Sequence, residues 1–167
     1  MPSNFEVPNP ILNSPYEEPK EYWDIKPGDP PKAPTPGRRP AFYYYRPPTT
    51  RDREQYGGEA GIAIELKLVN LIRKKLAQWR PLALRGEGGV SRTTHELLNY
   101  WRREGRKERL FFAQLEAAET VIFLTEARAD FLQGVDIPPD EPSEDRKQQG
   151  FAGFKRLACK MATGSGK

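Results

Sequence analysis

The sequence has few residues that could hold a fold together covalently or through a metal. It contains one cysteine, Cys159, and one histidine, His95, among 167 residues. A single cysteine cannot form an internal disulfide, and a lone histidine without nearby cysteines lacks partners for a zinc site. We therefore predict that Cys159 is a small buried residue and that His95 has a surface or capping role. A chain of this kind suits the cytoplasm, which is the localisation we predict.

The sequence also has no long hydrophobic run. No apolar stretch approaches the roughly 18 residues that a membrane-spanning helix requires, so we expect no membrane partner. The first six residues lack the basic and apolar regions of a secretory signal. With 37% hydrophobic and 30% charged residues, the composition is that of an ordinary soluble protein.

Proline is abundant but unevenly distributed, since 13 of the 17 prolines lie in the first 50 residues. Proline removes backbone donors and disfavours helix in the preceding residue, so residues 1–58 are predicted to form an extended arm. The arm has too many aromatic and aliphatic side chains for a solvated tail, and we expect it to wrap over a folded body. Its Tyr43, Tyr44 and Tyr45 follow two arginines and could stack on single-stranded nucleic acid. A short strand or packing segment is the favoured interpretation.

Helical periodicity begins after the arm and predicts a helical region over residues 59–105. Apolar residues recur every three or four positions from Glu59 to Trp79, and Pro81 is predicted to end this first helix. Ser91 with nearby threonines predicts the cap of a second helix that reaches about Arg103. A third helix is expected from about Leu110 to Phe131, followed by a surface loop over 134–150.

The net charge of +4 is modest, but the basic residues are clustered. Five lie between Ile62 and Arg80 and five between Tyr100 and Arg109. Such clusters permit contact with a polyanion such as DNA. The alternative is that they form only the solvated faces of helices.

The last residues carry the strongest chemical signal. The apolar run 157–162 is predicted to be a buried strand that leads into Thr163, Gly164, Ser165, Gly166 and Lys167. Glycines let backbone N–H groups surround phosphate oxygens, and a lysine can reach the β and γ phosphates. The pattern therefore indicates a phosphate-binding loop, and a flexible Gly/Ser terminus is the alternative.

Two segments together resemble the motifs of a known protein family. The segment Arg-Leu-Phe-Phe-Ala-Gln at 109–114 and the Thr-Gly-Ser-Gly-Lys loop occur in the order seen in superfamily 2 helicases of the DEAD/DEAH type. With residues 9–19, Leu-Leu-Asn-Tyr-Trp at 97–101 and Lys-Met-Ala before the loop, the chain is similar to the N-terminal region of type III restriction endonuclease helicase (Res) subunits. Met161 stands where the general loop has its first glycine, a position that varies among these helicases.

The resemblance implies that the intact protein is a P-loop NTPase with a RecA-like α/β fold and a parallel sheet. The present chain would be a mostly helical fragment of it, with an extended N-terminal arm and one strand that leads into the phosphate-binding loop. Residues 106–167 would begin the ATP-binding domain, which would be truncated at the catalytic Lys167. Gln114 would read adenine, or would be only a solvent-facing glutamine. The ATP-binding residues would be Gln114, Thr163, Gly164, Ser165, Gly166 and Lys167, with no protein ligand for a metal.

The implied parent is an ATP-dependent DNA translocase that uses ATP and Mg²⁺ and acts on double-stranded DNA, with a modification methyltransferase subunit as a further partner. The acidic motif, the arginine finger and the nuclease carboxylates of that family have no counterpart in the 167 residues, so we expect no measurable ATP hydrolysis by this chain alone, judged against a Lys167→Ala control. Two alternatives stay open. One is a non-enzymatic helical DNA-binding or interaction module, and the other is a different superfamily 2 ATPase such as an RNA helicase.

Overall fold

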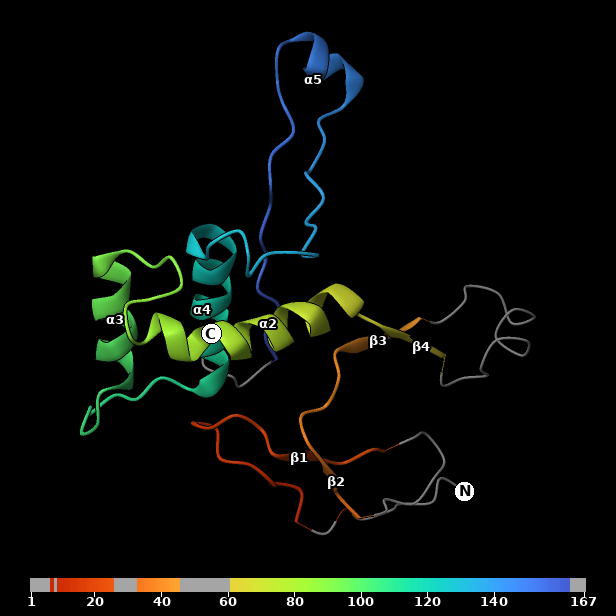
Figure 1. Cartoon of the computed structure of the whole chain (residues 1–167). Helices are drawn as coiled ribbons and strands as arrows, with labels where there is room; N and C mark the ends of the chain where they lie inside the picture. Colours follow the sequence, from red (N-terminus) through yellow and green to blue (C-terminus); the bar gives the residue numbers. More distant parts are fainter. Residues whose placement is uncertain (1–6, 8, 26–32, 46–60, 163–167) are drawn as a thin grey trace. The chain divides into compact units, whose positions relative to one another are not determined.

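The structure, a computed structural model, describes residues 7, 9–25, 33–45 and 61–162 (Figure 1). The chain divides into two compact units, Met1–Asn70 and Leu71–Lys167. The strands in the described part are β1 (Glu21–Tyr22), β2 (Thr35–Pro36), β3 (Phe42–Tyr45) and β4 (Ile62–Glu65). The helices there are α2 (Lys67–Ala83), α3 (Arg92–Arg102), α4 (Phe112–Glu126) and α5 (Glu144–Gln148).

The first unit contains two small antiparallel sheets. In one, β1 pairs with β2, and in the other β3 pairs with β4 so that Phe42 lies opposite Glu65. The three tyrosines predicted as a short strand or packing segment therefore lie in a strand. Aromatic residues suit such a pleated surface, and the Phe42 and Tyr44 rings, two positions apart on one face, meet edge to face at 5.2 Å.

The prediction that a helix begins at Glu59 is wrong, because residues 62–65 form β4 and α2 begins at Lys67. The backbone bonds of β4 come from β3, about 20 residues earlier, and helical periodicity cannot reveal such a partner. Asn70 joins the start of α2 to the same strand pair. Its Oδ1 accepts from Ala41 N at 2.8 Å and its Nδ2 donates to Glu65 Oε1 at 2.9 Å.

Helix α2 also continues beyond the residue predicted to stop it. Pro81 lies inside the helix, which ends at Ala83. Proline cannot donate to the carbonyl four residues earlier, but this loss falls in the last turn. The i to i−4 pattern resumes at once, because Leu84 N donates to Arg80 O at 3.1 Å.

The predicted start of α3 is confirmed. Ser91 is the N-cap residue, with Oγ accepting from Thr94 N at 3.2 Å. Glu126, the last residue of α4, adds a second cap, since its carboxylate accepts from Ser91 N at 2.9 Å and from Thr94 Oγ1 at 2.7 Å. A negative charge at a helix N-terminus is favourable. The end of α4 therefore holds the start of α3.

Helix α4 is shorter than predicted, since it spans Phe112–Glu126 rather than 110–131. Beyond it the chain turns back to the loop 86–89 between α2 and α3, where Arg128 N donates to Gly88 O at 3.2 Å. The same carbonyl accepts from Trp79 Nε1 at 3.0 Å. The backbone therefore leaves the helix where the loop offers this partner.

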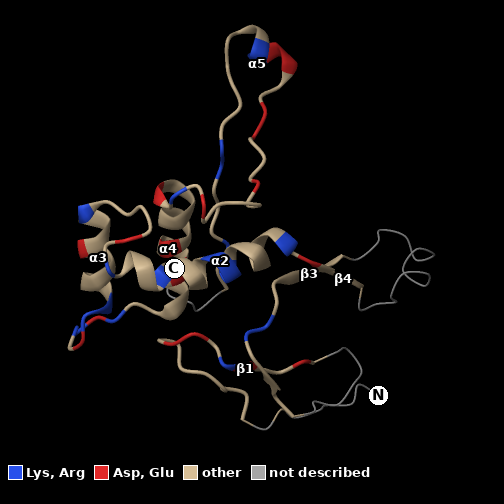
Figure 2. Ribbon diagram, viewed as in Figure 1, with Lys and Arg blue, Asp and Glu red and all other residues tan. Residues whose placement is uncertain are grey.

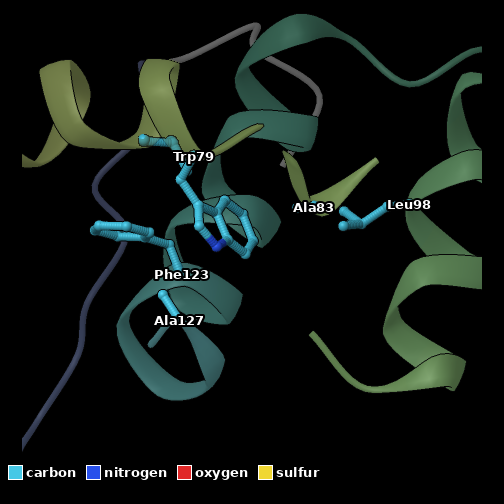
Figure 3. Close-up of a cluster of buried hydrophobic side chains, with 6 residues drawn as sticks. Trp79, Ala83, Leu98, Phe123 and Ala127 are labelled. Carbon is cyan, nitrogen blue, oxygen red and sulfur yellow. The ribbon is translucent and has the colours of Figure 1, made fainter. Parts of the chain in front are cut away.

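A small hydrophobic core joins α2, α3 and α4 (Figure 3). Trp79 and Phe123 are fully buried and meet at 5.5 Å between ring centroids, with Leu76 and Ala83 from the same helix as Trp79 and Leu98 from α3 around them. Burying a large apolar side chain contributes about 1.5–3 kcal/mol, so these few residues account for much of the stability of the second unit.

The strand predicted over 157–162 is not formed, because residues 155–162 have no assigned secondary structure. A buried parallel strand takes its hydrogen bonds from neighbouring strands, and the described part of this unit provides none. The chain before it forms one isolated antiparallel bridge between Asp140 and Phe154. Cys159 is consequently exposed, which corrects the prediction that it is buried.

Candidate nucleotide and nucleic-acid contacts

The residue predicted to read adenine, Gln114, lies in the first turn of α4. Its Oε1 accepts a hydrogen bond from Phe111 N at 2.8 Å, so the carboxamide caps its own helix. The N-cap residue Phe111 has no side-chain acceptor, and this bond is therefore one half of a capping box. This bond fixes the carboxamide at the first turn of α4.

The segment that leads to the predicted phosphate loop lies against α4. Cys159 Sγ is 3.9 Å from the carbonyl oxygen of Ala117. Ala117 is three residues after Gln114, and residues at that spacing are neighbours on a helix surface. The structure therefore brings the approach to the loop within about one turn of Gln114. The loop residues Thr163, Gly164, Ser165, Gly166 and Lys167 lie outside the described residues.

A buried ion-pair network occupies part of the basic clusters predicted to meet DNA. Glu119 on α4 is 1% exposed and accepts from Arg80 Nε of α2 at 2.8 Å. Arg102 of α3 pairs with the other oxygen of the same carboxylate. Arg80 also lies 3.8 Å from Glu116. These two arginines join three helices, so their main role is structural.

Other arginines of the second cluster lie in the segment after α3, where Figure 2 shows a run of basic residues; Arg103 is exposed and Arg106 is half-buried. Tyr100, at the end of α3, is 50% exposed. The guanidinium carbons of Arg103 and Arg106 lie 5.4 and 4.7 Å from its ring centroid, within cation–π range. This arrangement presents two positive charges beside an exposed aromatic ring.

The described residues offer little acid–base or metal chemistry. Within ranges 9–25, 33–45 and 61–162, no group of three histidine, cysteine or carboxylate side chains could hold a metal ion. The pKa of Asp130 is lowered, first by the hydrogen bond from Arg128, whose Nη2 lies 2.9 Å from Oδ2. Both side chains are exposed, and the pair is a surface ion pair.

The buried carboxylate is the residue that the sequence prediction missed. Glu119 falls four residues after Leu115 and four before Phe123, and all three are buried. A charged residue in register with an apolar stripe is a signal of a buried ion pair, because an unpaired buried charge is very costly. Two arginines on the preceding helices were available as partners.

Comparison with known proteins returned no family model, no curated protein and no solved structure that matches this chain. No helix among the described residues is both long and apolar enough to cross a membrane.

Proposed function

We propose that this chain is the ATP-binding entry of an ATP-dependent DNA translocase, of the type found in type III restriction enzymes. The observation that carries the proposal is the contact of Cys159 with Ala117, which brings the segment before the glycine loop, residues 163–167, beside the helix whose first turn contains Gln114. Thr163 is four positions after Cys159, a span of at most about 14 Å. Gln114 and the loop would then contact the two ends of one nucleotide.

In this proposal the two ends of ATP are bound by different chemistry. The Gln114 carboxamide would accept from the adenine 6-amino group and donate to N7, the pairing that suits an amide side chain. The backbone N–H groups of Gly164 and Gly166 would surround the phosphates, and Lys167 would neutralise their charge. Mg²⁺ would arrive bound to the phosphates, which are its usual ligands at such sites. The RecA-like parallel sheet and the methyltransferase partner belong to the same proposal.

Nucleotide selectivity provides the test. Gln114→Glu keeps an acceptor for Phe111 N, so the helix cap is retained, but it loses the donor to adenine N7. We expect this variant to weaken ADP binding about tenfold relative to the unchanged chain and to lose the preference for ADP over GDP, a free-energy change of about 1–2 kcal/mol. The measurement is displacement of a fluorescent nucleotide from the full 167-residue chain.

Two further variants separate the adenine contact from other effects. Gln133→Ala changes an exposed glutamine outside α4 and should leave both affinities unchanged. Lys167→Ala should weaken ADP and GDP binding equally, because a lysine reads phosphate and not the base. Equal affinity of the unchanged chain for ADP and GDP, or unchanged selectivity in Gln114→Glu, would refute the adenine role.

A non-enzymatic DNA-binding module is the second candidate. The exposed Tyr100 with its two arginines favours it, because this surface needs no nucleotide. The two candidates differ in whether binding of DNA depends on Gln114 and the glycine loop.

A further inference from the structure

The arginines at the end of α3 and just after it differ in whether a carboxylate neutralises their charge. Arg102 is neutralised by Glu119 in the buried network. In the described part of the chain, no carboxylate lies within ion-pair distance of Arg103, Arg106 or Lys107. Glu104 and Glu108 lie in the same exposed turn without pairing with these three side chains. Among the described residues, these three cationic side chains therefore have no ion-pair partner.

Tyr100 holds two of these charges in place. Both guanidinium groups lie within 5.5 Å of its ring centroid, so the ring restricts two otherwise flexible side chains. Arg106 Nη1 is buried and has no hydrogen-bond acceptor within the described residues. Its N–H groups are strong donors, and a buried donor without an acceptor costs about 1–3 kcal/mol.

A surface groove runs beside Tyr100 along α3. Its lining residues are His95, Glu96, Asn99, Tyr100 and Arg103. Glu96, the acidic member, forms an ion pair with Arg92 at 2.9 Å, so its charge is compensated within the helix. The groove therefore extends the positive turn without adding net negative charge.

We propose that Tyr100, Arg103, Arg106 and Lys107, here called the arginine–tyrosine surface, bind the phosphate backbone of DNA. Guanidinium groups match phosphate geometry with two parallel hydrogen bonds, and exposed aromatic rings among basic residues are typical of nucleic-acid contacts. DNA is also the partner in the proposed function, and the assignment of this surface to a translocase rests on that proposal. It uses none of the proposed nucleotide-binding residues.

Salt-dependent DNA binding tests the arginine–tyrosine surface. Anisotropy of a fluorescein-labelled 25-base-pair duplex would be measured with the full chain at several NaCl concentrations. Arg103→Gln/Arg106→Gln should weaken binding about tenfold or more at 50 mM salt and reduce the slope of log K against log salt by about two, because two phosphate contacts are lost. Tyr100→Leu, which keeps both charges but not the ring, should weaken binding with little change in slope.

The matched control is Arg128→Gln/Arg156→Gln, which removes the same charge from two exposed arginines elsewhere in the second unit. It should change affinity by no more than about threefold, with circular dichroism showing that all variants keep their helices. Equal loss in the two double variants would overturn the proposal, and so would equally tight binding of polyglutamate or no binding by the unchanged chain. Nucleotide displacement is measured in the absence of DNA, so failure of DNA binding here is distinguishable from failure of nucleotide binding.

Discussion

Replacing Glu119 with alanine is expected to lower the unfolding free energy of the second unit by about 3 kcal/mol. The carboxylate is 1% exposed and receives Arg80 and Arg102 from two other helices. Its removal leaves two guanidinium groups without their buried partner. These side chains keep 16% and 24% exposure, so water can partly compensate, and we expect the lower end of the range known for broken buried pairs.

Urea unfolding followed by circular dichroism would measure the loss. Glu119→Gln retains an oxygen acceptor of the same size, so we expect a smaller loss than with alanine. Glu96→Ala is the control, because the pair between Arg92 and Glu96 is exposed and such pairs contribute about 0.3–0.5 kcal/mol. If the alanine variants at 119 and 96 lost the same free energy, the network would have no special part in joining the helices.

The sequence was informative where a local interaction determines the structure. Ser91 was predicted to cap α3 because its hydroxyl bonds a backbone N–H only three residues ahead. The apolar spacing around Trp79 likewise predicted a packed helix face, which the buried core confirms. Both signals depend on residues within about one or two turns of each other.

The sequence was misleading where a distant segment supplies the partner. Residues 62–65 became a strand because β3 pairs with them, and residues 157–162 formed none because no strand of the described part of the second unit lies alongside. Strand pairing is a property of two segments, so neither outcome follows from one apolar run. The same reasoning explains Glu126, whose capping of Ser91 links positions 35 residues apart.

The basic residues show most clearly what composition alone cannot predict. Arg102 and Arg103 are adjacent and identical in type, yet one pairs with a buried carboxylate and the other lies over an exposed ring. A basic cluster read as a single DNA-binding feature therefore combines structural and surface residues. Only the position of Glu119 on another helix separates them.

Gly89→Ala is expected to destabilise the second unit by about 3 kcal/mol or more. Gly89 has a φ of +99°, a conformation that costs other residues about 1–2 kcal/mol. An added Cβ would also lie 2.6 Å from Glu126 O and 2.9 Å from Arg128 N. These are backbone atoms held between α4 and the loop 86–89, so they cannot rotate away as a side-chain end would.

Gly105→Ala provides a matched control for this prediction. Gly105 has a φ of +73°, but an added Cβ would meet nothing within 4 Å. It should therefore show only the conformational cost of about 1–2 kcal/mol, and the difference between the two variants measures the close approach of the loop to the end of α4. Thermal or urea unfolding of both variants would give that difference. If Gly89→Ala were no more destabilising than Gly105→Ala, the end of α4 would be free to move away from the loop, and the Glu126 cap on α3 would be lost at little cost.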